Sequence, residues 1–171
     1  MRVYAAEIGD RDGSKRVREL LAYGYHEMFG EKMPDIAKTD KGKPYFPQKP
    51  GIFFSLSHTD THVLCVLGKE PVGGDIQTVR PVKERIIQRV CTKNELECFS
   101  FYQLWTLKES WIKLNGYLDR ELLTVEFSGS PVRIVPPLPA TSAKLYTIGE
   151  CIAAVCTKDG MPPSEIIQVE L

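Results

Sequence analysis

Residues 52–67 read Ile-Phe-Phe-Ser-Leu-Ser-His-Thr-Asp-Thr-His-Val-Leu-Cys-Val-Leu, and this stretch decides the fold class. Two apolar runs, 52–56 and 63–67, flank a polar segment that contains Ser57, His58 and Asp60. Short apolar runs that are rich in β-branched and aromatic residues and separated by turn-forming residues are typical of buried strands. We therefore predict a hairpin of two buried strands here.

On the N-terminal side of this hairpin, the pattern predicts one strand, one helix and a long irregular segment. Residues 3–8 have the composition of a short strand, and apolar residues at helical spacing predict a helix over 15–28. Several prolines between residues 30 and 51 exclude a helix there and favour loop or extended chain.

On the C-terminal side, helices come first and strands follow. Residues 72–76 predict a third short strand, residues 82–90 have helical spacing, and the capping box that starts at Thr92 predicts another short helix. The strongest helical pattern covers 100–115, where Gly116 is expected to end it. Four further strands are predicted, at 125–127, 132–135, 144–148 and 151–156. This mixture predicts an α+β fold.

Composition limits the class of protein. The 171 residues are 43% hydrophobic and 26% charged, which suits one globular domain over residues 1–171. Twenty-two basic residues balance twenty-two acidic ones, which argues against nucleic acid as the main partner. No apolar run approaches the ~20 residues of a membrane-spanning helix. With no signal-peptide core at the N-terminus, and an odd five cysteines that include no C-x-x-C pair, we expect a reduced, cytoplasmic protein without membrane attachment.

One internal similarity suggests a repeated unit. Residues 63–70, Val-Leu-Cys-Val-Leu-Gly-Lys-Glu, resemble residues 152–159, Ile-Ala-Ala-Val-Cys-Thr-Lys-Asp, and each segment ends a predicted hairpin. The pattern permits two similar halves, at about 1–75 and 76–171, packed side by side. Because such halves already form an internal pair, we expect a monomer.

Three segments place ionisable groups where a fold usually has inert ones. His58 follows an apolar strand, Asp75 follows two glycines, and Glu109 and Lys113 share one face of the strongest helix. Each has an ordinary structural explanation: a turn histidine, a turn-forming aspartate, and a solvated surface pair worth ~0.3–0.5 kcal/mol. None of them alone indicates a function.

Together, these residues suit a ligand that contains a diphosphate. Two carboxylates from separate elements, Asp75 and Glu109, can hold Mg²⁺, which prefers oxygen ligands and is usually completed by phosphates and water. Lysines beside such a metal neutralise phosphate charge, and His58 adds a donor for phosphate. The sequence has neither a P-loop nor a dinucleotide-binding G-x-G-x-x-G motif, so those two phosphate sites do not account for it.

The order of these motifs resembles that of 4'-phosphopantetheinyl transferases of the surfactin-synthetase-activating type, which are single chains of two halves. The most specific motif is Trp-x-x-Lys-Glu-Ser at residues 105–110. The motifs that carry the resemblance are Gly42-Lys43-Pro44, residues 54–58, Gly74-Asp75-Ile76, residues 105–110 and Lys113.

The resemblance implies Mg²⁺-dependent transfer of the phosphopantetheine arm of coenzyme A to a serine of an acyl or peptidyl carrier protein, with release of adenosine 3',5'-bisphosphate. It also implies an α+β fold of two pseudo-symmetric halves, each a small antiparallel sheet packed with helices, with the ligand at their junction. The roles that it implies are metal ligation by Asp75 and Glu109, activation of the serine by Glu109, contact of Lys113 with the coenzyme A phosphates, and nucleotide binding by Lys43, Ser57 and His58, with His58 near the 3'-phosphate.

The chain departs from this family in two respects. Many relatives have an acid two residues after the aspartate, where this chain has Gln77. An amide oxygen can still bind Mg²⁺ or hold its water, but with one negative charge fewer, so we expect weaker metal binding. The N-terminal half also lacks a segment that in longer relatives supplies basic residues for the nucleotide.

Two alternative functions remain open at this stage. The first is a catalytically weak or inactive coenzyme A-binding protein associated with carrier-protein machinery, which the two departures favour. The second is a Mg²⁺-dependent nuclease that uses Asp75 and Glu109, which the zero net charge disfavours.

Overall fold

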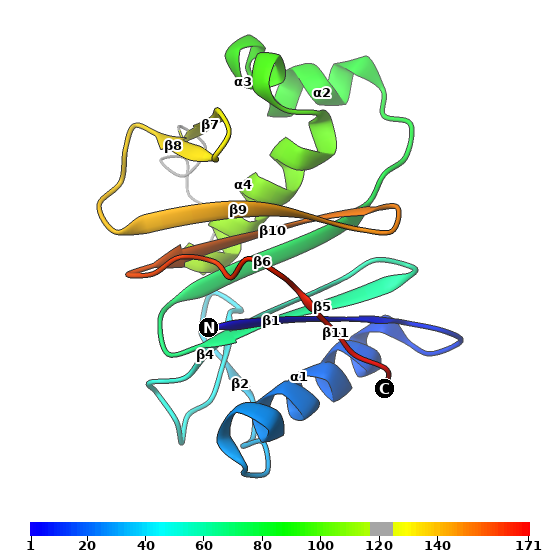
Figure 1. Ribbon diagram of the computed structural model, residues 1–171, viewed down its shortest axis with the longest axis vertical. Helices are drawn as coiled ribbons and strands as arrows, with labels where there is room; N and C mark the ends of the chain where they lie inside the picture. Colours follow the sequence, from blue (N-terminus) through cyan, green and yellow to red (C-terminus); the bar gives the residue numbers. More distant parts are fainter. Residues whose placement is uncertain (117–124) are drawn as a thin grey trace.

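The computed structural model describes residues 1–116 and 125–171, which form strands and helices in mixed order (Figure 1). The first part contains β1 (Arg2–Glu7), α1 (Gly13–Phe29), β2 (Ala37–Lys38), β3 (Pro44–Tyr45), β4 (Phe53–His58), β5 (His62–Gly68) and β6 (Val72–Thr78). Three helices follow: α2 (Glu84–Val90), α3 (Lys93–Cys98) and α4 (Phe101–Asn115). The last part contains β7 (Glu126–Ser128), β8 (Arg133–Val135), β9 (Thr141–Ile148), β10 (Cys151–Lys158) and β11 (Ile167–Gln168).

The hairpin predicted from residues 52–67 is confirmed. β4 and β5 pair in antiparallel register, with Leu56 opposite Cys65. The predicted capping box is present at Thr92, and Gly116 ends α4 with a left-handed backbone at φ 80°. Among residues 1–116 and 125–171, the sequence pattern missed three strands of two residues, β2, β3 and β11, because two residues are too few to show a periodicity.

Two groups of elements share one connectivity. In the first, β1 leads through α1 to the hairpin β4–β5, and the sheet order is β1-β5-β4, with β11 added beside β1. In the second, β6 leads through α4 to the hairpin β9–β10, and the sheet order is β6-β10-β9. β5 and β10, whose sequences resemble each other, therefore take the same central place in their sheets. The expected division at residues 75 and 76 falls inside β6, which already belongs to the second group.

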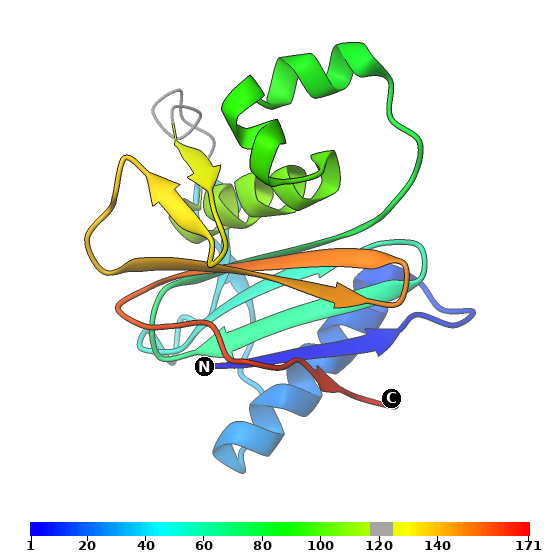
Figure 2. The ribbon, with the colours of Figure 1, turned by 45° about the horizontal axis from the view of Figure 1, so that its top comes forward.

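The two sheets pack against each other, and each is covered on its outer face by one helix (Figures 1 and 2). The alternation of side chains along the strands explains these layers. In β1, Val3 and Ala5 join the core between the sheets, whereas Tyr4 and Ala6 join the core under α1. β10 shows the same alternation, with Val155 in the core between the sheets and Cys156 in the core under α4.

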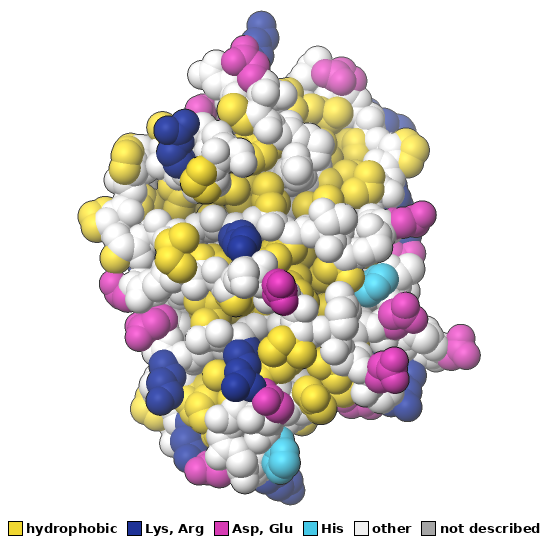
Figure 3. Space-filling model, viewed as in Figure 1, with side chains coloured by type: hydrophobic (Ala, Val, Ile, Leu, Met, Phe, Trp, Pro, Cys, Tyr) yellow, Lys and Arg dark blue, Asp and Glu magenta, His cyan; other side chains and the backbone are white. Residues whose placement is uncertain are grey.

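The surface and the cysteines agree with the composition. Basic and acidic side chains are interspersed on the face that Figure 3 shows. All five cysteines are free; Cys65, Cys91, Cys151 and Cys156 are buried, and Cys98 is exposed. None of the helices formed by the described residues has the length and apolar character needed to cross a membrane.

Two neighbouring glycines allow three elements to meet at β6. A β-carbon on Gly73 would lie 2.0 Å from the carbonyl oxygen of Ser110 in α4, and one on Gly74 would lie 2.5 Å from Cγ2 of Val66 in β5. Real β-carbons do not approach other atoms so closely, so only glycine permits this packing. The glycines therefore bring the next residue, Asp75, close to both α4 and the first sheet.

We predict that Gly73→Ala destabilises the protein by about 1–3 kcal/mol, because α4 must move away from β6 to accommodate the methyl group. At this chain length, thermal unfolding should show a decrease in Tm of about 2–4 °C per kcal/mol. Gly51→Ala is the matched control, because its β-carbon would have no atom within 4 Å. Equal Tm values for the two variants would contradict the proposed close packing.

Candidate functional site

The candidate site lies where the two sheets meet. β4 and β6 are each the last strand of their sheet, and serine hydroxyls of β4 bond to the backbone of β6. Ser55 Oγ accepts a hydrogen bond from the Gly74 amide at 2.9 Å, and Ser57 Oγ accepts one from the Ile76 amide at 3.4 Å. These hydroxyls accept hydrogen bonds from backbone amides of β6 that would otherwise need the carbonyl groups of a further strand. These bonds between β4 and β6 hold Ser57 beside the carboxylate of Asp75.

Asp75 is the centre of the site, with only 2% of its surface exposed. Its Oδ1 accepts hydrogen bonds from Ser57 Oγ at 2.7 Å and from Lys113 Nζ at 2.6 Å. Its Oδ2 accepts one from Gln77 Nε2 at 3.0 Å. A buried carboxylate is tolerated when it is paired and hydrogen-bonded, and Asp75 satisfies both conditions. Three of the residues singled out in the sequence thus converge on one carboxylate.

Glu109 lies one helical turn before Lys113 on α4. Burial and the negative charge of Asp75 raise the pKa of Glu109, while the positive charge of Lys113 opposes this rise. The negative charges of Asp75 and Glu109 therefore repel each other where the two sheets meet, and the positive charge of Lys113 partly offsets this repulsion. A divalent cation relieves such repulsion, so the donor set fits Mg²⁺. The described residues contain no group of three or more His, Cys, Asp or Glu side chains that could hold a metal, so phosphate and water oxygens would have to complete the shell.

Gln77 lies beside the proposed metal ligand Asp75. The sequence suggested that its amide oxygen binds Mg²⁺ or holds the water of the ion; in the structure, its Nε2 donates to Asp75 Oδ2 at 3.0 Å. In this arrangement the amide stabilises the carboxylate, and the amide oxygen does not point at it. The side chain is nevertheless in contact with the expected metal ligand.

Lys43 and Lys113 line one cavity of about 360 Å³ between residues 41–44, β4 and α4. Lys43 Nζ donates a hydrogen bond to the carbonyl oxygen of Leu114 at 2.7 Å, at the C-terminal end of α4. Burial, together with the charge of Lys158, lowers the pKa of Lys43 to about 8. The remaining lining residues are Lys41, Gly42, Pro44, Phe54, Ser55, Leu56, Ile112 and Gly116. The cavity thus reaches from the Lys43 loop to the ammonium group that binds Asp75.

His58 lies apart from these groups. It is exposed at the end of β4, and its Nδ1 lies 3.3 Å from the carbonyl oxygen of Thr59. Its ring packs against Gly13 at the start of α1, where an added β-carbon would lie 2.7 Å from Nδ1. His58 does not line the cavity that contains Lys43 and Lys113.

A buried ion pair beside the site was not found from the sequence. Glu95, with none of its surface exposed, accepts hydrogen bonds from Lys108 Nζ at 2.9 Å, from the Thr92 amide at 2.9 Å and from the Phe127 amide at 3.2 Å. It therefore ties α3, α4 and β7 together through Lys108, the residue before Glu109 on α4. The capping box gave a signal for the bond to Thr92, but a local motif carries no information on distant partners.

Comparisons with known proteins agree with the motifs. Residues 71–130, which include Asp75 and Glu109, match the family model described as the 4'-phosphopantetheinyl transferase superfamily. The chain is 34% identical over 85 residues to 4'-phosphopantetheinyl transferase Sfp of Bacillus subtilis (strain 168), covering 44% of this chain and 38% of that protein. It is 32% identical over 109 residues to psf-1 of Bacillus pumilus, with 57% and 47% coverage, and 25% identical over 138 residues to AcpT of Salmonella typhi, with 73% and 68% coverage. The chain thus spans less than half the length of the two Bacillus relatives.

We predict that Glu109→Gln raises the Tm at pH 7 in buffer that contains a metal chelator. Because the pKa of Glu109 is higher in the folded protein than its ordinary value, ionisation costs folding free energy above the folded pKa, and the amide avoids this cost. The difference should disappear below pH 4.5, the ordinary value, where the carboxyl group is protonated in both the folded and the unfolded state.

Thermal unfolding followed by circular dichroism between pH 4 and pH 8 measures this difference. Each kcal/mol corresponds to about 2–4 °C at this chain length. Glu97→Gln, on the exposed side of α3, is the control and should leave the Tm unchanged. A lower Tm for Glu109→Gln at pH 7 would show that the carboxylate stabilises the fold, against our assignment.

Proposed function

Because residues 71–130 match the model of the 4'-phosphopantetheinyl transferase superfamily, we propose that the chain is a member of this family and that it transfers the 4'-phosphopantetheine arm of coenzyme A to a serine hydroxyl of an acyl or peptidyl carrier protein. The other product is adenosine 3',5'-bisphosphate. The observation that most supports this proposal is the convergence of Asp75, Glu109 and Lys113 at the junction of the two sheets. The shared connectivity of the two groups of elements supports two pseudo-symmetric halves with the ligand between them.

Asp75 and Glu109 are the proposed ligands of Mg²⁺, with Gln77 as a third contact, direct or through water. When bound, this ion would neutralise the negative charge of the diphosphate. Lys113 supplies a second positive charge at the same place, and its side chain is still 30% exposed, which leaves it accessible to a phosphate. Such positioning of charge is the main contribution that proteins make to phosphoryl transfer.

Glu109 is the proposed general base. Its raised pKa makes it a stronger base than an ordinary carboxylate, and α4 holds it in a fixed position. In the transfer, the serine oxygen forms a bond to the phosphorus that carries the pantetheine arm, and the phosphoanhydride bond to the bisphosphate breaks. The serine proton passes to Glu109. Base catalysis of this kind contributes ~10²–10⁴-fold.

Lys43, Ser57 and His58 are the proposed contacts to the nucleotide end. Lys43 lines the cavity next to Lys113, which supports its role. Ser57 already donates to Asp75, so its hydroxyl also orients that carboxylate. His58 stays a prediction, because its exposed ring lies at the start of α1, outside the cavity.

A transfer assay tests the proposal. We expect the protein, incubated with coenzyme A, Mg²⁺ and an apo carrier protein, to add one phosphopantetheine group to the carrier, as measured by intact mass. Glu109→Ala should lower kcat by at least ~10²-fold, because it removes the base and a proposed metal ligand. Its Tm should not fall, which separates loss of catalysis from loss of folding.

Glu97→Ala serves as the control and should retain wild-type turnover. Binding of coenzyme A by the wild-type protein, without transfer to any carrier, would favour the alternative, a coenzyme A-binding protein that lacks catalysis. The neutral Gln77 beside Asp75 is the observation that keeps this alternative open.

We predict that Gln77→Glu tightens Mg²⁺ binding, because the added carboxylate lies next to Asp75 and restores a negative charge to the proposed metal site. The apparent Kd for Mg²⁺, measured by titration calorimetry and by the Mg²⁺ dependence of transfer, should decrease. Gln48→Glu adds the same charge at an exposed position and should have no effect. Unchanged affinity in Gln77→Glu would remove residue 77 from the metal site.

A further inference from the structure

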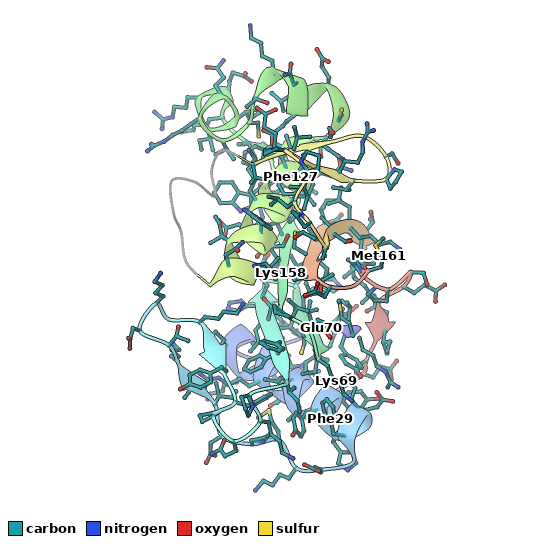
Figure 4. The ribbon with its side chains drawn as sticks, turned by 90° about the vertical axis from the view of Figure 1, so that its left-hand side faces the viewer. Phe29, Lys69, Glu70, Phe127, Lys158 and Met161 are labelled. Carbon is teal, nitrogen blue, oxygen red and sulfur yellow. The ribbon has the colours of Figure 1, made fainter. Side chains whose placement is uncertain are left out.

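Glu95 is a charged side chain with none of its surface exposed, and it does not line the cavity that contains Lys43 and Lys113. Its three hydrogen bonds come from Lys108 on α4, from the Thr92 amide at the start of α3 and from the Phe127 amide on β7. Figure 4 shows Phe127 below the short helices α2 and α3, on the part of the molecule that contains α4. One carboxylate therefore holds α3 and β7 to α4.

The surroundings of this ion pair are apolar. The charges of Glu95 and Lys108 both act on the buried thiol of Cys91, which belongs to the same core as Leu107 and Phe127. Two opposite charges in such a core add little net stability, because desolvation offsets their attraction, and an apolar pair of similar volume often serves as well. Stability alone therefore does not account for this pair. What such a pair can specify is geometry, since the two charged groups must stay in contact.

The geometry in question is that of α4. Lys108 and Lys113 each bind a buried carboxylate, Glu95 in the first case and Asp75 in the second. Five residues of an α-helix correspond to a rotation of about 140° and a rise of about 7.5 Å, so the two pairs hold α4 from different directions and at different heights. One pair alone would leave the helix free to turn about that contact. With both pairs, α4 cannot rotate or slide without breaking one of them.

Glu109 lies between these two contacts, directly after Lys108 in the sequence. Its partly buried carboxylate is close enough to Asp75 for the charge of Asp75 to act on it. A rotation of α4 about the contact of Lys113 would carry Glu109 away from Asp75, while Lys113 kept its own bond. The position of Glu109 therefore depends on the second contact, the one between Lys108 and Glu95.

Resting on the proposed function, we infer that Glu95 is a positioning residue: by binding Lys108, it sets the rotation of α4 that directs Glu109 towards Asp75. The ammonium group of Lys108 is engaged by Glu95 and only 16% of its side chain is exposed, which leaves Lys113 as the lysine of α4 that can bind a phosphate. Glu95 thus acts on the reaction through α4 and not through contact with a ligand.

The test removes both charges at once. Glu95→Gln/Lys108→Met abolishes the ion pair without leaving a lone buried charge, and a neutral pair of this kind often folds as stably as the ion pair. We expect kcat for transfer to a carrier protein to fall by about 10-fold to 10²-fold, the range expected for a group misplaced by about 1 Å. The KM for coenzyme A should change by less than about threefold, because Lys113 keeps its bond to Asp75.

Mg²⁺ binding provides a readout that does not depend on turnover. Titration calorimetry with Mg²⁺, without a carrier protein, should show an apparent Kd raised at least about threefold in the double variant, a smaller effect than loss of a direct partner of a metal ligand.

Two controls separate position from stability. Val17→Ala, in the core under α1, should lower the Tm but leave kcat unchanged at a temperature at which the protein is folded. Lys49→Met/Glu31→Gln removes an ion pair of two exposed side chains and should change neither kcat nor Mg²⁺ binding. A merely structural role of Glu95 predicts the behaviour of Val17→Ala for the double variant as well.

Glu95→Asp is a milder variant that decides the question if the double variant does not fold. It keeps both charges but shortens the side chain by one methylene group, so α4 must shift for Lys108 to stay in contact. We expect kcat to fall by at least about threefold, again with little change in the KM for coenzyme A. An unchanged kcat in this variant would contradict the inference.

The outcomes separate this inference from the proposed function. If the wild-type protein modifies a carrier and the double variant keeps the wild-type kcat and Mg²⁺ affinity, the inference is wrong and the function stands. A KM for coenzyme A that rises as much as kcat falls would also overturn the inference, because it would place the pair in ligand binding. If the wild-type protein transfers no phosphopantetheine group to any carrier, the proposed function is wrong and the inference falls with it.

Discussion

The ion pair between the buried Asp75 and the partly exposed Lys113 is the interaction on which the rest of the site depends. It joins β6 to α4 at 2.6 Å, and Ser57 adds β4 through the same carboxylate oxygen. A buried pair gains little net stability, because desolvation offsets the attraction, but loss of one partner leaves a charge that the interior cannot solvate. The pair therefore fixes where the two sheets and α4 meet, and so determines where a ligand can be held.

The glycines before Asp75 make this meeting possible. Without side chains at Gly73 and Gly74, β6 lies directly between α4 and β5. The unpaired edges of β4 and β6 would ordinarily invite a further strand, but serine hydroxyls occupy the amides there. The edges of β4 and β6, which could otherwise pair with another chain, are thus closed by serine side chains. Asp75 lies on β6 at this junction.

The residues of the candidate site come from distant parts of the chain. The family match covers residues 71–130 and so includes Asp75, Glu109 and Lys113, but Lys43 and Ser57 lie outside it. The repulsion between the carboxylates of Asp75 and Glu109 is a cost in the protein alone, and a bound cation would relieve it. A site that binds its ligand tightly is often unfavourable when empty, for this reason.

The sequence by itself determined the elements and the identity of the acidic residues. Hydrophobic periodicity, capping boxes and glycine stops act over a few residues, so the hairpin, α1 and α4 could be predicted to within about two residues of their ends, and α3 by its start at Thr92. The helical repeat also placed Glu109 and Lys113 on one face. Only the tertiary structure decided that Lys113 pairs with Asp75, that Glu95 is buried against Lys108, and that Lys43 binds the end of α4. The partners in each of these contacts come from different elements, and the packing of those elements, which no local pattern encodes, determines the distance between their side chains.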